Sequence, residues 1–188
     1  MTGSGDVARI DLNADLGELA DGGELDRAML AVVTSTSIAA GGHAGGGEIL
    51  RRTVGAAVAA GVSIGAHPSY PDRAGFGRTS MADRVDGTVV ARFVADQVRA
   101  VAEACDEAGV SMRHVKAHGA LYGDLAAIDW LAEAFLDGMV AGARRGPLAV
   151  LGPGDSVLER TCAARGIPFV TEGFADRAYR ADGSLAKL

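Results

Sequence analysis

The sequence predicts an α/β protein, a (β/α) barrel formed by a single domain over residues 1–188. Short β-type runs alternate with longer helical patterns, which is typical of βαβ units with a parallel sheet. Several strands carry polar residues at alternate positions, which suits a barrel whose lumen holds a site. A doubly wound sheet fits the alternation too, but no glycine-rich phosphate fingerprint follows the first strand.

Six strands and five helices account for most of the chain. The expected strands are residues 9–16, 36–43, 62–68, 113–119, 148–153 and 168–174. The expected helices are residues 24–35, 47–60, 83–108, 125–143 and 154–165. A closed barrel of this type has about seven or eight strands, so we expect this barrel to be open, or incomplete at its C-terminal end.

The first strand, "RIDLNADL", alternates polar with apolar residues. Asp11, Asn13 and Asp15 share one face, because residues two apart in a strand point the same way. The other face carries Ile10, Leu12, Ala14 and Leu16. We expect the polar face to line the lumen and the apolar face to pack against helices.

The second and third strands each lead to a histidine through small residues. In "SIAAGGH" the face that ends in His43 carries serine, alanine and glycine, and in "SIGAH" serine and glycine precede His67. Small residues leave room in the lumen. The helix at 47–60 has an apolar stripe with the spacing of an amphipathic helix. We expect Asp83 to cap the third helix and Gly109 to end it.

The fourth strand, "RHVKAHG", places His114, Lys116 and His118 on one face. A strand buried in an apolar core has no need of such a face, so we expect charged partners opposite it. In the last strand, "VTEGF", Glu172 has an inward position of the same kind.

Five strand ends therefore carry an acid or an imidazole: Asp15, His43, His67, His118 and Glu172. The active sites of (β/α) barrels lie at the carboxyl ends of the strands, and buried charges are costly unless they are paired or used. Such groups bind a divalent metal or share acid–base work. The metal candidates are Asp15, His43, His67 and His118. With Lys116 as a cation for a carboxylate or phosphate, the set favours amide or lactam hydrolysis.

Composition and charge exclude several classes of protein. A net charge of −6 makes nucleic acid an improbable partner, and no apolar run approaches the roughly 20 residues that span a bilayer. The N-terminus lacks a signal-peptide pattern, so we expect a cytoplasmic protein. Cys105 and Cys162 have no metal-type spacing and are expected to be reduced, buried thiols. Neither a G-x-S-x-G elbow nor a P-loop is present.

Five blocks of the sequence resemble the LamB/YcsF family, the A subunits of 5-oxoprolinase. They are "IDLNADLGE", "SIAAGGHAG", "GAHPSYPDRAGFGR", "VKAHGALY" and "FADRAYRADGSL", and they extend from about residue 9 to 185. The resemblance implies a (β/α) barrel of the glycoside hydrolase/deacetylase type. It also implies ATP-dependent opening of a small lactam, 5-oxo-L-proline, to L-glutamate together with subunits B and C, with ATP and a possible divalent metal as cofactors.

The resemblance also implies roles for particular residues. Those expected in catalysis are Asp15, Glu18, His43, His67, Lys116 and His118. Those expected to bind substrate or cofactor are Asp11, Asn13, Arg78, Tyr122, Glu172, Asp176 and Arg177. Two alternatives stay open here: Arg78 clamps an anion or is a surface arginine, and Asp176 and Arg177 reach the site or form a capped turn.

The chain also departs from the usual family pattern. "SIACGFHAGDP" has become "SIAAGGHAGGG", and "VKPHGALYN" has become "VKAHGALYG"; the changed positions are Ala40, Gly42, Gly46, Gly47, Ala117 and Gly123. Family chains continue for several tens of residues beyond "DGSL", which would supply the last strand or strands. Two other functions stay open: a metal-dependent deacetylase or amidase acting alone, and a truncated, non-catalytic family member.

Overall fold

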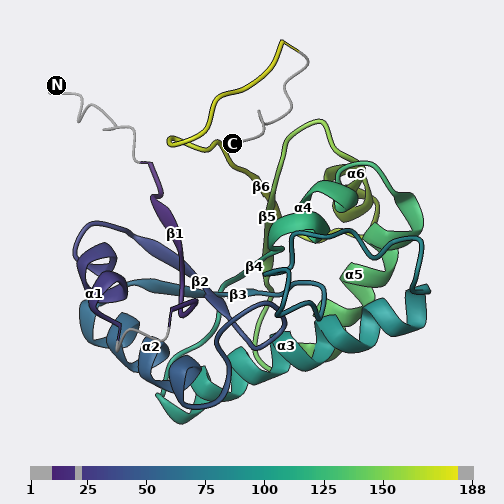
Figure 1. The fold of residues 1–188 in the computed structure, drawn as a ribbon. Helices are drawn as coiled ribbons and strands as arrows, with labels where there is room; N and C mark the ends of the chain where they lie inside the picture. Colours follow the sequence, from purple (N-terminus) through teal and green to yellow (C-terminus); the bar gives the residue numbers. More distant parts are fainter. Residues whose placement is uncertain (1–9, 20–22, 182–188) are drawn as a thin grey trace, which may run out of the picture.

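The computed structural model describes residues 10–19 and 23–181 (Figure 1). The start of the first predicted strand, at residue 9, lies outside the described residues. The strands are β1 Asn13–Leu16, β2 Ser35–Ala39, β3 Ser63–His67, β4 His114–Lys116, β5 Ala149–Gly152 and β6 Phe169–Thr171. The helices are α1 Glu24–Leu30, α2 Gly47–Ala60, α3 Gly87–Glu107, α4 Gly119–Leu125, α5 Asp129–Gly142 and α6 Val157–Ala164.

The six strands form one parallel sheet in the order of the sequence, β1 to β6. A doubly wound sheet would reverse its strand order at a switch point, so the preference for a barrel is confirmed. Within the described residues the sheet stays open between β1 and β6, which confirms an open, half-barrel form of the α/β fold. The single domain and the glycoside hydrolase/deacetylase type remain predictions.

Helices α1, α2, α3, α5 and α6 pack side by side in that order around the outside of the sheet (Figure 1). The outward face of the strands packs against this layer with buried aliphatic residues, which include Ile38, Ile64, Val115 and Val150. The inward face is polar. Its register aligns Asp15, Ser37, Gly65 and His114 in one row across four neighbouring strands. None of the described helices is long and apolar enough to cross a lipid bilayer.

Several predicted boundaries were wrong for local reasons. The N-cap of α3 is Asp86, whose carboxylate accepts a hydrogen bond from the Val89 amide; Asp83 lies in the preceding turn. The prediction of a strand to residue 119 missed α4, because the chain leaves β4 after Lys116 and His118 becomes the N-cap of α4. The first helix ends at Leu30, five residues before its predicted end, because Ser35 already belongs to β2.

Other predictions concern individual side chains. Cys105 and Cys162 are confirmed as free, buried thiols, and burial raises the pKa of each to about 11. The expected apolar face of the first strand is confirmed only at its end: Leu16 is buried, whereas Ile10 and Leu12 are 79% and 47% exposed. Regular pairing starts only at Asn13, so these two residues precede the part of the strand that the helices cover.

Close packing of α5 on α3 depends on a glycine. A Cβ atom added at Gly138 would lie 2.4 Å from the Ala91 carbonyl oxygen, whereas one added at Gly55 in α2 would meet nothing within 4 Å. We expect Gly138→Ala to destabilise the fold by about 2 kcal/mol, since overpacking forces the two helices apart. Gly55→Ala is the matched control and should stabilise by about 0.5–1 kcal/mol. Urea unfolding measures both, and an unchanged midpoint for Gly138→Ala would contradict this packing.

Candidate active site in the barrel lumen

The floor of the lumen is a hydrogen-bonded network of amide, hydroxyl and imidazole groups around His114. The Asn13 amide donates to Ser35 Oγ at 2.8 Å, and Ser37 Oγ donates to Asn13 Oδ1 at 3.0 Å. His114 Nε2 lies 3.2 Å from Ser37 Oγ. Burial, with a further contribution from the Lys116 charge, lowers the pKa of His114 to about 4, so this imidazole is neutral at pH 7.

The small residues predicted in the lumen have a specific purpose at this floor. A Cβ atom at Gly65 would lie 2.2 Å from the His114 ring, so only glycine lets the ring lie flat against β3. Asp11 belongs to the edge of the same network, where it accepts a hydrogen bond from Ser35 Oγ at 2.6 Å. The structure therefore places Asp11 and Asn13 below the charged groups, where they join β1 to β2.

Above the floor, Asp15 connects two halves of the site. Its Oδ1 atom lies 2.7 Å from Lys116 Nζ, and its Oδ2 atom lies 3.2 Å from His67 Nε2. Burial opposes ionisation of Asp15, but His67 and Lys116 outweigh it and lower the pKa of this carboxyl. Glu172 lies on the far side of the lysine, with Oε2 at 3.7 Å from Nζ. The polar face of β4 thus meets the charged partners that its sequence predicted.

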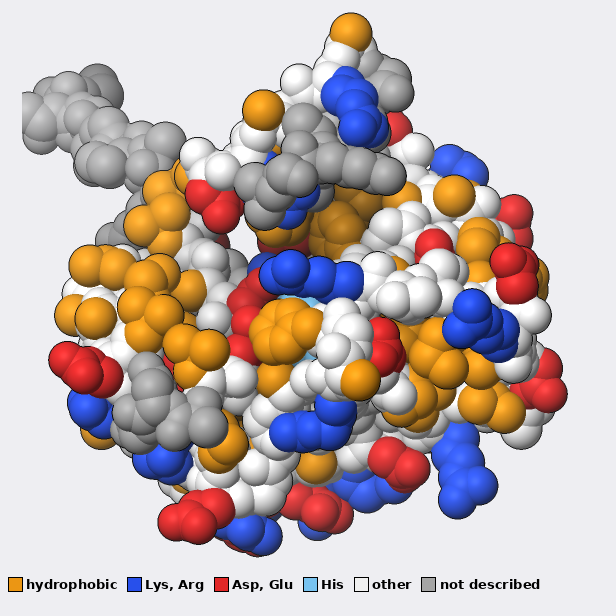
Figure 2. Space-filling model, in the orientation of Figure 1, with side chains coloured by type: hydrophobic (Ala, Val, Ile, Leu, Met, Phe, Trp, Pro, Cys, Tyr) orange, Lys and Arg blue, Asp and Glu red, His pale blue; other side chains and the backbone are white. Residues whose placement is uncertain are grey.

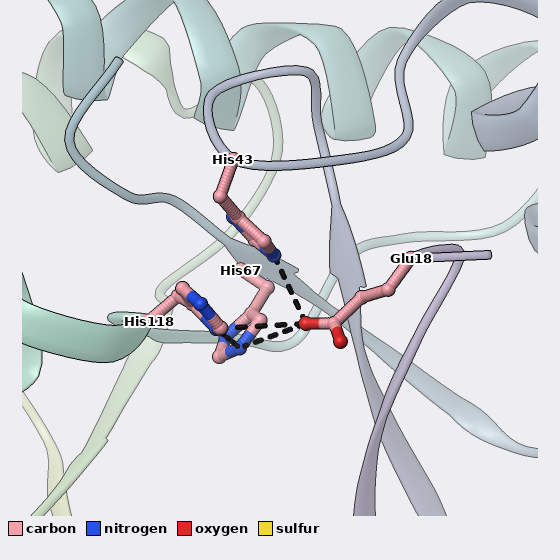
Figure 3. A group of neighbouring side chains, drawn as sticks. All are labelled: Glu18, His43, His67 and His118. Carbon is pink, nitrogen blue, oxygen red and sulfur yellow. Dashed lines mark hydrogen bonds and ion pairs between the residues drawn. The ribbon is translucent and has the colours of Figure 1, made fainter. Parts of the chain in front are cut away.

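A second group of residues surrounds the Glu18 carboxylate. Glu18 Oε1 lies 2.9 Å from His43 Nε2, 3.5 Å from His118 Nδ1 and 3.9 Å from His67 Nε2. Figure 3 shows this carboxylate pointing at three histidines that come from three different segments of the chain. One ligand atom from each of the four residues lies within 4.8 Å of all the others. We call Glu18, His43, His67 and His118 the histidine cluster.

Backbone carbonyl groups fix the tautomers of two of these histidines. His67 Nδ1 lies 2.7 Å from the Lys116 carbonyl oxygen, and His118 Nε2 lies 3.0 Å from the Phe76 carbonyl oxygen. A carbonyl oxygen only accepts, so each of these ring nitrogens carries the proton. The opposite nitrogens, His67 Nε2 and His118 Nδ1, face each other at 3.0 Å as two acceptors. Such a pair needs a shared proton or a cation between its lone pairs.

His43 makes different contacts from those of His67 and His118. Its ring stacks on the His118 ring, with centroids 3.6 Å apart and planes 3° from parallel. Its Nε2 atom donates to Glu18, while its buried Nδ1 atom has no hydrogen-bond partner among the described residues. Burial lowers the pKa of His43, and burial together with the charge of His67 lowers that of His118 to about 4. Both rings are therefore neutral at pH 7.

The electrostatic balance of the lumen favours a divalent cation. Three carboxylates, Asp15, Glu18 and Glu172, face one ammonium group, Lys116, which leaves two formal negative charges beside the neutral imidazoles of His43 and His118. Burial opposes ionisation of Glu18, but the hydrogen bond from His43 and the nearby imidazoles outweigh it and lower the pKa of this carboxyl. Carboxylate oxygens and imidazole nitrogens are the ligands that zinc prefers in enzymes. Glu18, His67 and His118 fit such an ion best, because the backbone carbonyl groups bond the other ring nitrogens, His67 Nδ1 and His118 Nε2, and leave the facing nitrogens for the ion.

His43 fits a metal ion less well than the other two histidines. To offer Nε2 as a ligand, it would have to carry its proton on Nδ1, which has no acceptor within the described residues. A buried N–H group without an acceptor costs about 1–3 kcal/mol. The geometry therefore suits His43 as the hydrogen-bond donor that orients Glu18.

The loop between β3 and α3 covers the histidine cluster. Phe76 has φ of 54°, a conformation that is strained for any residue except glycine. The centroid of its ring lies 5.2 Å from that of His43 and 5.3 Å from that of His118. Gly77 packs against both histidines, where a Cβ atom would lie 3.0 Å from His43 Cβ. Arg78 lies over Phe76 at 5.3 Å and is exposed. In Figure 2 only small areas of histidine are visible beneath hydrophobic and charged side chains.

The far wall of the site follows β6. Tyr122 faces Glu172, and burial together with the charge of this carboxylate raises the pKa of the tyrosine. The Tyr122 ring also meets Phe174 edge-on at 5.8 Å, and Lys116 Nζ lies 5.7 Å from the Phe174 ring. Asp176 and Arg177 lie in the turn that follows, and Asp176 is exposed.

Phe76 and Phe174 were not among the residues expected from the sequence. Each had a signal: Phe76 is flanked by two glycines in "GFG", and Phe174 follows Glu172 by two positions on the same face.

The glycines that depart from the usual family pattern have definite surroundings. A side chain at Gly42 would collide with Gln97 Oε1 at 2.3 Å, because Gln97 fills this space and bonds the Ser69 backbone through both of its polar atoms. Gly47 has φ of 53°, a conformation that proline cannot adopt. Arg73 Nη1 holds the loop through the carbonyl groups of Gly41 and Gly45 at 3.0 and 3.2 Å. The loop that carries His43 is thus held in place by the Arg73 side chain.

The neutral floor predicts an acid sensitivity of folding. The pKa of His114 falls from 6.5 to about 4 on folding, so its contribution of about 3 kcal/mol is present above pH 6.5 and is lost as pH falls toward 4. We expect urea midpoints to fall over this range, and Glu107→Ala, on the surface, to leave the slope unchanged. His114→Gln, which keeps a polar atom near Ser37 but cannot titrate, should flatten the dependence; an unaltered slope would contradict this assignment.

Comparison with known proteins places the chain in a family. The LamB/YcsF family matches residues 10–188. A protein named as the A subunit of 5-oxoprolinase, from Methylococcus capsulatus, is 45% identical over 181 residues, which cover 94% of this chain and 67% of that protein. The protein of the same name from Streptomyces griseus is 45% identical over 180 residues, covering 94% of this chain and 70% of the relative.

A solved structure gives the same result for the fold. The crystal structure of the lactam utilization protein from Thermus thermophilus superimposes with a TM-score of 0.87 at 33% identity, covering 96% of this chain and 72% of that one. The sequence resemblance is therefore confirmed, and the chain belongs to the LamB/YcsF family.

Proposed function

We propose that this chain is the lactam-opening subunit of a cytoplasmic 5-oxoprolinase. With subunits B and C, it would convert 5-oxo-L-proline to L-glutamate in a reaction coupled to ATP. The observation that carries the proposal is the contact of Asp15 with Lys116 on one side and with His67 of the histidine cluster on the other. The names of the relatives, 5-oxoprolinase A subunit and lactam utilization protein, support this substrate class.

The chemistry of a five-membered lactam explains the need for both ATP and acid–base groups. A lactam is an unreactive amide, and phosphorylation of its oxygen would turn a poor electrophile into a good one. Water must then add to the carbonyl carbon and the C–N bond must break, so that the ring nitrogen leaves as an amine and a γ-glutamyl phosphate forms. A second water must hydrolyse this acyl phosphate to glutamate and inorganic phosphate. Each step moves a proton or creates negative charge on oxygen, so a donor, an acceptor and a cation are required close together.

The residues of the site supply these groups. Lys116 donates to the lactam oxygen as negative charge develops there. Asp15 is the carboxylate nearest to Lys116. It accepts a proton from the attacking water and returns it to the ring nitrogen as the C–N bond breaks. Glu18, His67 and His118 would hold a divalent ion, with His43 orienting Glu18; such an ion polarises carbonyl groups and lowers the pKa of water.

A second candidate function is a metal-dependent amidase or deacetylase that acts alone. The histidine cluster favours it, since three imidazoles and a carboxylate within 4.8 Å suit metal-assisted hydrolysis without a nucleotide. The two functions differ in what they require. The first needs ATP and the partner subunits, whereas the second needs only the metal and the amide.

We expect glutamate to form from 5-oxo-L-proline and ATP when this chain is mixed with B and C subunits of a close relative. His118→Ala should lower the rate at least about 100-fold, because it removes a member of the histidine cluster. Glu107→Ala, which changes an exposed ion pair with Arg51, is the control. Turnover without ATP or partners would favour the second candidate, and no turnover from the folded chain would favour a non-catalytic family member.

We expect the chain to bind one Zn²⁺ ion, measured by titration calorimetry. His67→Ala and His118→Ala should each weaken Zn²⁺ binding by at least about tenfold. Even loss of a residue that only hydrogen-bonds a metal ligand typically lowers metal affinity by that factor. His43→Ala should cost less, because its Nδ1 atom lacks an acceptor. His114→Gln should have no effect. A larger loss for His43→Ala than for His67→Ala would contradict the tautomers assigned above.

A further inference from the structure

Lys116 and Glu172 present a hydrogen-bond donor and an acceptor side by side in the lumen. Lys116 Nζ and Glu172 Oε2 are 3.7 Å apart, which is too far for a hydrogen bond between them. Lys116 gives one of its three N–H groups to Asp15 Oδ1 at 2.7 Å and keeps others for a ligand. Glu172 Oε1 has no hydrogen-bond partner among the described residues. Both groups therefore retain capacity for hydrogen bonds.

The surroundings of the pair suit a small ring. The rings of Tyr122 and Phe174 stand perpendicular to each other at 5.8 Å beside the pair and offer an apolar wall for methylene groups. The side chain of Lys116 is only 5% exposed and that of Glu172 15%, whereas Asp15 keeps 32% of its side chain in solvent. A ligand therefore reaches the pair from the Asp15 side, where the proposed chemistry takes place.

The geometry of amides decides what such a pair can recognise. In a small lactam the amide is held cis, so its N–H and C=O groups point out of the same edge of the ring. In an open-chain secondary amide the trans form places N–H and C=O on opposite sides, and the cis form costs about 2.5–4 kcal/mol. Neighbouring donor and acceptor groups of the protein can thus bind both amide groups of a lactam together, but only one of a trans amide.

We propose that Lys116 and Glu172 together recognise the cis-amide edge of the lactam. Lys116 donates to the lactam oxygen, Glu172 accepts from the ring N–H, and Tyr122 and Phe174 pack against the ring carbons. This inference rests on the proposed function and adds to it a reason for substrate choice: the pair selects lactams over open-chain amides and over lactones, whose ring oxygen cannot donate.

The test compares three ligands by calorimetry on the full chain, with Zn²⁺ present and without ATP or partners. They are 5-oxo-L-proline, the lactone in which oxygen replaces the ring N–H, and the open-chain amide N-acetyl-L-alanine. We expect the unaltered chain to bind the lactam at least tenfold more tightly than either analogue, because the lactone has no N–H for Glu172 and the trans amide can bond only one of the two protein groups at a time. Glu172→Met, similar in size but with no acceptor oxygen, should bind lactam and lactone within about threefold of each other.

Two further variants and the pattern of binding distinguish the outcomes. Glu172→Gln keeps an acceptor oxygen and should retain part of the preference, and Glu107→Met on the surface should retain all of it. Equal binding of lactam and lactone by the unaltered chain would overturn the inference while leaving the proposed function intact. No binding of the lactam by a chain that is folded by circular dichroism would overturn the inference, and the glutamate assay with ATP and the B and C subunits would then decide the proposed function separately. The comparison of ligands on the unaltered chain decides the question even if Glu172→Met does not fold.

Discussion

The contact of Asp15 with Lys116 and His67 is the interaction on which the rest of the site depends. Its two oxygens lie 2.7 Å from the lysine and 3.2 Å from the imidazole, so one carboxylate aligns β1 with both β3 and β4. On one side the contact leaves Lys116 beside Glu172 and the aromatic wall. On the other it leaves His67 facing His118 in the histidine cluster. A substrate between these halves would meet the cation, the acid–base carboxylate and the metal ligands together.

The backbone prepares the histidine cluster for a cation before any ligand arrives. The carbonyl groups of Lys116 and Phe76 accept hydrogen bonds from His67 and His118, so the opposite ring nitrogens face each other at 3.0 Å. Phe76 holds its carbonyl in place through a strained φ of 54°, which is the type of strain that functional sites store. The remaining negative charge of the carboxylates attracts a positive ion to the same point. Hydrogen bonding and electrostatics therefore both favour a cation between these histidines.

Much of the fold and of the inward-facing residues could be predicted from the sequence. Alternation of polar and apolar residues placed Asp15, Lys116 and His114 on inner faces, because a strand has a period of two. The short helix α4 could not be found, since its sequence "GALYGDL" contains two glycines, Gly119 and Gly123, and its start depends on His118 turning away from β4. Pairings such as Asp15 with Lys116, or Phe76 with His118, join residues far apart in the sequence, and only the assembled barrel brings them together. Asp11 and Asn13 were predicted on the correct face of the strand, but they lie at the floor of the lumen. Their depth in the lumen is set by the register of β1 against β2, which the sequence pattern does not give.

The most direct test of this account is the ¹⁵N NMR spectrum of the histidine rings during titration with Zn²⁺. The account predicts that the signals of His67 Nε2 and His118 Nδ1 move as the ion binds, while both ring nitrogens of His114 keep their shifts. It also predicts that His67 Nδ1 and His118 Nε2 remain protonated throughout, as their carbonyl partners require. Binding through those protonated nitrogens, or through His114, would contradict the assignment of the site.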